Sequence, residues 1–62
     1  MIGWIVTYEH PHKGVGEVID KVLTAQEYEA GIVAETTYMV LEKGGRVVMV
    51  TPDDVVSAKK KG

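Results

Sequence analysis

The chain has 62 residues, a formal net charge of −2 and no cysteine. A chain of this length is one domain, 1–62, near the lower limit for independent folding, because it buries only about 60% of its unfolded surface. The lack of cysteine excludes disulfides and thiolate metal sites. No apolar run approaches the roughly 18 residues of a membrane span, and the first residues lack the basic segment of a signal peptide. We therefore expect a protein of the cytoplasm or of a virus-infected cell.

The charge balance argues against a dedicated nucleic-acid binder. Lysine and arginine total 7 and aspartate and glutamate total 9, whereas such proteins use a basic excess to displace counterions from phosphates. The one basic cluster is residues 59–61. We expect it to belong to a flexible basic tail over residues 58–62.

The apolar residues are mainly β-branched. The chain has eleven valines and four isoleucines, against two leucines and no phenylalanine. Stiff branched side chains pack well on a pleated surface. The composition therefore predicts a mainly β fold.

The first half of the chain begins with a clear strand pattern and then becomes ambiguous. Apolar residues alternate over residues 2–8, which predicts a strand, and the Pro11 and Gly14 region that follows predicts a loop. Over residues 15–23 the apolar positions fit one face of a helix, but the β-branched residues also fit a buried strand. We favour a strand over residues 17–23.

Residues 24–31 carry helix signals. Thr24 and Glu27 have the spacing of a capping box, and Gly31 can supply a left-handed stop. These signals predict a short helix or turn over residues 25–30. If residues 15–23 are also helical, the fold becomes α+β, with a helix over residues 15–30 packed on a three-stranded antiparallel sheet.

The strongest signal is the pair Gly44 and Gly45 between two β-rich runs. Two glycines suit a two-residue primed turn, which predicts a tight hairpin. Counting outward from that turn pairs Leu41 with Val48 and Met39 with Val50. Both faces of the hairpin are then largely apolar, so one face lines the core. The other must be covered by another part of the chain or by a partner.

The segment after the hairpin changes character at residues 51–54. A threonine, a proline and two aspartates open either a helix or a single 3-10 turn that leads to a last short strand.

The glycine-led segment 14–19 and the later segment 45–55 together resemble the SH3-like small barrels, in particular the Tudor-like and KOW-like branches. The second segment combines one strand of a hairpin, a proline-acid turn and the start of a closing strand. The resemblance implies a five-stranded barrel that binds a ligand. The helix signals described above add a short helix or turn near residues 25–30 to that barrel. The chain departs from the family in its extra residues over about 24–35 and in lacking the basic residues of KOW-type binders.

Two groups of side chains are candidates for a binding site, one for a metal ion and one for a cationic ligand. His10 and His12 stand near Glu9 and have the spacing of metal ligands, but a structural site needs four ligands and no further histidine or cysteine exists. We therefore expect a solvated loop and assign no metal or cofactor. Aromatic residues can form a surface or a cage for methylated cations. The candidates for that surface are Trp4, Tyr8 and Tyr28.

No catalytic constellation is evident, so we expect no enzyme. The lone serine has no base near it in sequence, and no glycine-rich phosphate loop is present. The leading hypothesis is an interaction module that self-associates or is an accessory subunit of a larger assembly. The alternatives are a nucleic-acid or ribosome-associated binder and a small viral structural or host-regulating protein.

These hypotheses assign different surface residues. A protein partner would contact the hairpin residues Tyr38, Met39, Val47 and Met49. An anionic partner would contact the cations Lys13, Arg46, Lys59 and Lys60.

Overall fold

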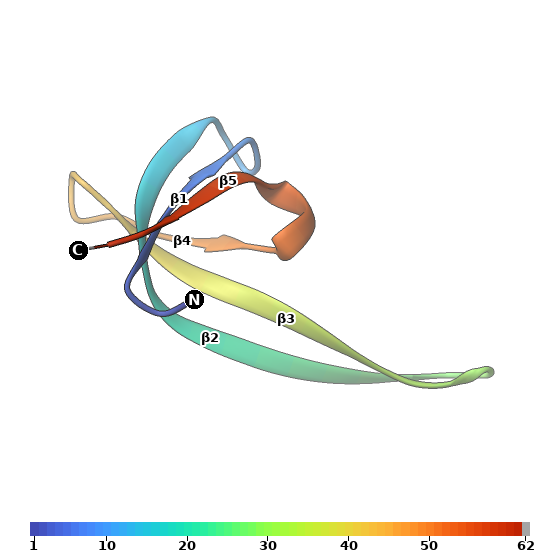
Figure 1. The fold of residues 1–62 in the computed structure, drawn as a ribbon. Helices are drawn as coiled ribbons and strands as arrows, with labels where there is room; N and C mark the ends of the chain where they lie inside the picture. Colours follow the sequence, from blue (N-terminus) through green and yellow to red (C-terminus); the bar gives the residue numbers. More distant parts are fainter. Residues whose placement is uncertain (62) are drawn as a thin grey trace.

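The computed structural model describes residues 1–61, which form one antiparallel sheet of five strands (Figure 1). The elements are β1 (Trp4–Tyr8), β2 (Gly14–Tyr28), β3 (Gly31–Glu42), β4 (Val47–Val50), the 3-10 helix η1 (Pro52–Asp54) and β5 (Val55–Lys60). The strand order in the sheet is β4-β3-β2-β1-β5. The mainly β prediction is confirmed. The alternative with a helix over residues 15–30 is wrong, because that segment pairs with β3 along most of its length.

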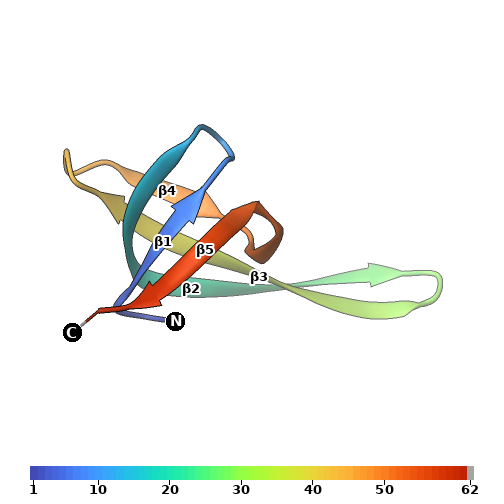
Figure 2. The same cartoon turned by 45° about the horizontal axis from the view of Figure 1, so that its top comes forward.

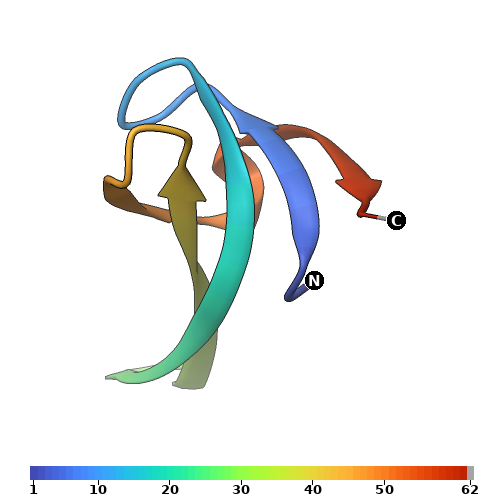
Figure 3. The same cartoon turned by 90° about the vertical axis from the view of Figure 1, so that its left-hand side faces the viewer.

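The sheet curls strongly but is not closed into a barrel, which corrects the expectation of a closed structure (Figure 3). β4 and β5 are the two edge strands, and no backbone pairing joins them among residues 1–61. Closure needs every strand to be paired on both sides. Here β4 has only four residues and the chain then turns into η1.

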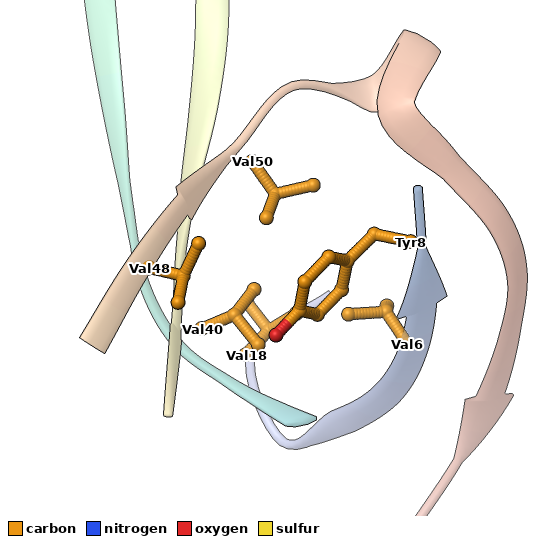
Figure 4. Packing of buried hydrophobic residues seen from close by; sticks show 6 residues of the cluster. All are labelled: Val6, Tyr8, Val18, Val40, Val48 and Val50. Carbon is orange, nitrogen blue, oxygen red and sulfur yellow. The ribbon is translucent and has the colours of Figure 1, made fainter. Parts of the chain in front are cut away.

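One small cluster forms the core. Its members are Val6, Tyr8, Val18, Val40, Val48 and Val50. Figure 4 shows the Tyr8 ring among the five valines, which come from four different strands. Tyr8 is thus the one large side chain around which the curled sheet packs.

The hairpin between β3 and β4 exists, but its register differs from the prediction by one residue. The structure pairs Leu41 with Val47 and Val40 with Val48. Gly45 N–H donates to Glu42 O at 2.9 Å, Glu42 N–H donates to Arg46 O at 2.8 Å, and Gly45 has φ +92°. These bonds describe a three-residue loop, a type I turn followed by a left-handed glycine. A one-residue change of register moves every side chain to the other face relative to its partner strand.

The prediction of a short helix or turn over residues 25–30 is wrong except at its end. β2 continues to Tyr28, the turn is Glu29 and Ala30, and β3 begins at Gly31 with φ +131°. The capping-box pattern at Thr24 is local, whereas the strand is held by pairing with β3 from Gly16 to Tyr28. Continuous cross-strand pairing outweighed the weak helix preference of a few residues.

The ends of the sheet also differ in detail from the sequence expectations. The first strand begins at Trp4 rather than at residue 2. Residues 58–60 of the expected flexible tail lie in β5 and pair with β1. Residue 62, the last of that tail, lies outside the described residues. The 3-10 alternative for residues 52–54 is confirmed. Among the described residues, no helix is long and apolar enough to cross a membrane.

Gly16 marks a close approach between β2 and β3. A Cβ atom there would lie 2.5 Å from Val40 Cγ1 and 2.7 Å from the Leu41 carbonyl oxygen. We expect Gly16→Ala to lower the free energy of unfolding by about 1–3 kcal/mol through overpacking. Gly44→Ala is the control, because nothing lies within 4 Å of its Cβ position. Urea unfolding of both variants tests this, and equal midpoints would contradict it.

Candidate interaction surface

The β2–β3 hairpin extends well beyond the core as a two-stranded arm, which we define as residues 20–37 (Figure 2). β2 has 15 residues and β3 has 12, whereas strands usually have about 5–6. The molecule measures 40 × 23 × 19 Å along its principal axes, and the arm accounts for the long dimension in Figure 1. A β-bulge between Val18 and Asp20 marks the point where the arm leaves the sheet. Bulges bend and twist a strand in this way.

The arm exposes large apolar side chains that the core does not cover. Leu23 is 66% exposed and Ile32 is 74% exposed, the largest fraction among the exposed apolar residues. Three further large apolar side chains of the arm are exposed: Val22, Tyr28 and Val33. The protein therefore has a small buried core and, on the arm, a substantial apolar surface that is exposed to water.

These apolar residues occupy both faces of the arm. Lys21 pairs with Tyr38, which packs against the core, so alternation assigns the arm's odd-numbered β2 residues to the core-side face. That face carries the pairs Leu23–Thr36, Ala25–Ala34 and Glu27–Ile32. The opposite face carries Val22, Val33 and Tyr28, together with polar residues.

Both long edges of the arm are unpaired. β1 pairs with β2 only over Gly14–Glu17, and Gly3 N–H donates to Val18 O at 2.7 Å just beyond. β4 pairs with β3 only from Tyr38 onward. The edges of residues 20–28 and 31–37 therefore present backbone donors and acceptors to solvent, the template on which another strand adds.

An isolated two-stranded hairpin is at best marginally stable in water. Every residue from Ile19 to Glu35 is exposed, so few apolar contacts support the arm. Side-chain support at the tip includes the hydrogen bond that the Tyr28 hydroxyl donates to Gln26 Oε1 at 2.6 Å. A partner that covers the arm would supply the missing burial.

The arm is also acidic. It contains the four acids Asp20, Glu27, Glu29 and Glu35 and a single cation, Lys21. Its formal charge is therefore −3, whereas the rest of the chain is near neutral. Any partner surface must accommodate this charge.

The residues predicted to contact a protein divide between two faces. Tyr38 is half-buried and packs against the core. Met39, Val47 and Met49 lie together on the opposite, outer face, where Met39 pairs with Met49. Leu41, which the sequence prediction left out, joins them through its pairing with Val47 and is 39% exposed. The hairpin thus has one buried and one exposed apolar face, and Tyr38 belongs to the buried face.

The predicted aromatic residues do not come together. Tyr8 is 1% exposed at the centre of the core, whereas Tyr28 lies at the tip of the arm. Trp4 is half-buried at the start of β1. These positions do not form a shared aromatic surface.

The predicted anion-binding cations lie at opposite ends of β1. Lys13 and Arg46 belong to loops at the Tyr8 end. Lys59 and Lys60 pair with Ile5 and Trp4 at the other end. The next lysine, Lys61, forms an ion pair with Glu17 at 2.7 Å. The cations therefore form no single basic stripe.

A polar cluster that sequence reasoning missed closes the Tyr8 end of the core. The buried Tyr8 hydroxyl donates a hydrogen bond to Glu42 Oε2, and His12 Nε2 lies 2.6 Å from the same oxygen. The His12 ring also meets the Tyr8 ring edge-on at 5.9 Å between centroids. His12 therefore participates in the fold, and no group of three potential metal ligands occurs among residues 1–61.

The cluster shifts the pKa values of its members in opposite directions. Burial, followed by the hydrogen bond to Glu42, raises the pKa of Tyr8 from 10.0 to about 12. The hydrogen bonds from Tyr8 and then His12 lower the pKa of Glu42 below its usual 4.5. At neutral pH the tyrosine is thus held neutral and the glutamate ionised, a stable arrangement rather than an acid and base poised to exchange a proton.

The Tyr8 shift predicts a loss of stability in alkali. Because the folded-state pKa is above the unfolded one, the stabilisation is complete below pH 10 and disappears as the pH rises through about 12. Tyr8→Phe removes the hydroxyl and its hydrogen bond. The variant should therefore be less stable than the wild type at neutral pH, and this difference in stability should shrink between pH 10 and 12. Urea midpoints of both proteins across this range test the prediction, and a constant difference would contradict it.

The lowered pKa of Glu42 affects the stability of the fold at acidic pH. Because the pKa of Glu42 is lower in the folded state, the ionised carboxylate adds to the free energy of unfolding above pH 4.5. This stabilisation is lost as the pH falls through the lowered pKa.

An open depression of about 410 Å³ lies between the base of the arm and η1. It is lined by Glu35, Thr36, Thr51, Pro52 and Asp53. Asp54, beside it, accepts hydrogen bonds from Thr51 N–H and the Thr51 hydroxyl, which lower its pKa. Glu35 and Asp53 are exposed, so the depression does not provide the dry, enclosed surroundings that separate the pKa values of catalytic carboxylates.

Comparison with known proteins finds no protein-family model, curated protein sequence or solved structure that matches the chain.

Proposed function

We propose that this protein is a non-enzymatic interaction module whose binding element is the arm, and that it works by self-association. One observation carries the proposal: a two-stranded arm with apolar side chains on both faces and two free edges extends from a domain with six core residues. Burial of such side chains is worth about 25 cal/mol per Å². Association is a route to that stabilisation, because no segment among residues 1–61 covers the arm.

The lack of an enclosed site among residues 1–61 supports a non-enzymatic role. The Tyr8–Glu42–His12 cluster is a partly buried support for the loops. The outer face formed by Met39, Val47 and Met49 continues the apolar surface beyond the arm. Methionine-bearing surfaces of this kind suit contact with a protein.

The five strands and the proline-acid turn before β5 agree with the expected SH3-like architecture, whereas the open sheet departs from it. In this proposal the curled sheet is the scaffold, and the long β2–β3 arm is the specialised addition. The added residues are the extra ones over about 24–35, which the SH3-like barrels lack.

Sedimentation equilibrium of the purified chain tests self-association. We expect a mass above that of the monomer at micromolar concentration and a return towards the monomer on dilution. Leu23→Ser combined with Ile32→Ser removes the two most exposed apolar side chains of the arm, and this variant should be monomeric. Val56→Ser, at a position that is also exposed at 61% but lies in β5, is the matched control and should associate as the wild type does.

A wild-type chain that remains monomeric at high micromolar concentration would contradict self-association. An equal loss of association in the control variant would move the contact away from the arm.

A further inference from the structure

We infer that the partner is a second copy of this chain, joined through the free edge of β2 in an antiparallel, two-fold symmetric pairing centred on Thr24. This inference rests on the proposed function and specifies its interface. The product would be one continuous sheet in which the two arms lie side by side, with the order β3-β2 in one copy followed by β2-β3 in the other.

The backbone of the arm fixes which groups are available on that edge. Tyr28 and Gly31 are the last pair of the ladder and flank the two-residue turn, which makes them a hydrogen-bonded pair. Hydrogen-bonded and non-hydrogen-bonded pairs alternate along an antiparallel ladder. The β2 residues that direct N–H and C=O groups to the free edge are therefore the alternate ones: Lys21, Leu23, Ala25 and Glu27.

A two-fold axis at Thr24 pairs these residues with one another. Leu23 of one copy lies opposite Ala25 of the other, and Lys21 lies opposite Glu27. Both pairs join residues whose backbone groups point outward, as an antiparallel ladder requires. Opposite charges that face each other across strands stabilise the pairing, whereas like charges oppose it.

Charge selects this register over its neighbours. The arm has one cation and four acids, so two arms repel unless each Lys21 meets a carboxylate. Shifting the axis by one residue towards Leu23 pairs Lys21 with Ala25, and shifting it towards Ala25 pairs Leu23 with Glu27. The Thr24 axis alone joins both lysines to strand carboxylates and leaves Leu23 beside alanine.

The other free edges fit less well. The β3 edge presents Ile32, Ala34 and Thr36, which carry no charge to fix a register or to relieve the repulsion between the arms. The β5 edge is basic through Lys59 and Lys60 and would attract an acidic arm head-to-tail. Such a contact joins two different surfaces, and heterologous contacts generate rings or open chains rather than one self-complementary pairing of two arms.

A pair of proline variants distinguishes the edges. Ala25 and Ala34 lie directly opposite each other in the arm, and both direct their N–H groups outward, away from the β2–β3 ladder. Ala25→Pro removes a donor from the β2 edge, and Ala34→Pro removes one from the β3 edge at the same cost to the arm. We expect Ala25→Pro to be monomeric by sedimentation equilibrium and Ala34→Pro to remain a dimer.

Charge reversal tests the register without proline. Lys21→Glu and Glu27→Lys each place like charges opposite each other at two symmetric sites, and each should weaken dimerisation by about 10-fold or more. The double variant Lys21→Glu/Glu27→Lys restores opposite charges and should return to within about 3-fold of the wild type. Glu29→Lys changes the net charge as Glu27→Lys does but lies in the turn, and it should not weaken the dimer.

Each outcome decides the proposal. Dimer loss in Ala25→Pro with rescue in the double charge variant supports it. Loss in Ala34→Pro alone, or only on reversal of Lys59 and Lys60, overturns the β2 interface while leaving self-association intact. A wild-type chain that is monomeric at high micromolar concentration overturns both this inference and the proposed self-association.

Discussion

Replacing Tyr8 with alanine is expected to unfold the domain. Tyr8 is the only large aromatic residue of the core and is 1% exposed among five valines. Removal of a buried aromatic side chain costs about 3–5 kcal/mol. A small core without disulfides supplies about the same amount in total. The variant should therefore be largely unfolded at room temperature, as seen by far-UV circular dichroism.

The control for this variant is Val56→Ala, because Val56 is 61% exposed in β5. Its free energy of unfolding should change by no more than about 0.5 kcal/mol. A cooperative unfolding transition in Tyr8→Ala with a midpoint close to that of the wild type would show that the core does not depend on this ring.

Shortening the arm is expected to abolish association and to leave the body folded. Val22 and Thr37 form a pair of the ladder two steps from the bulge, and an Asn-Gly turn suits such a connection. A variant in which Asn-Gly replaces residues 23–36 loses none of the six core residues. It should keep a cooperative unfolding transition and sediment as a monomer at every concentration.

The same loop replacement separates two roles of the arm. If the shortened chain still associates, the outer face around Met39 and Met49 is the interface. If it fails to fold, the arm contributes to the body through long-range effects that its exposure does not suggest. The nearest matched comparison is the Ala34→Pro variant, which keeps the full arm.

The strands were predictable because they follow from residue type and from short-range sequence patterns. β-branched residues dominate the chain, and the alternation before Tyr8 and the proline-acid turn at Pro52 each indicate their structure directly. The hairpin at Gly44 and Gly45 was predictable for the same reason. Its register was not, because a glycine pair also suits a three-residue loop, in which only the second glycine has a positive φ.

The arm was harder to predict because its residues satisfy two local patterns. Thr24 and Glu27 have helix-capping spacing, but the segment is held by its pairing with β3. Pairing of this kind depends on residues elsewhere in the chain and leaves no local signal. The weak alternation over residues 20–28, which mixes apolar and polar residues on both faces, was the one available indication.

The Tyr8–Glu42–His12 cluster was not predictable, since its members are up to 34 residues apart. The sequence showed His12 beside His10 and suggested a metal or a solvated loop. The fold instead brings Glu42 from the end of β3 to the loop after β1. The contact passes over Gly14 of β2, where a Cβ atom would lie 2.8 Å from Glu42 Oε2 and 2.8 Å from the Tyr8 hydroxyl oxygen.

Amide hydrogen exchange followed by NMR at low and high protein concentration tests the central claim most directly, namely that the arm is the surface through which this protein associates. The N–H groups of Leu23, Ala25 and Glu27 point to the free edge of β2. They should exchange rapidly in dilute protein and become protected as the concentration rises, while Thr24 and Gln26 change less. Rapid exchange at those three positions at every concentration would contradict the account.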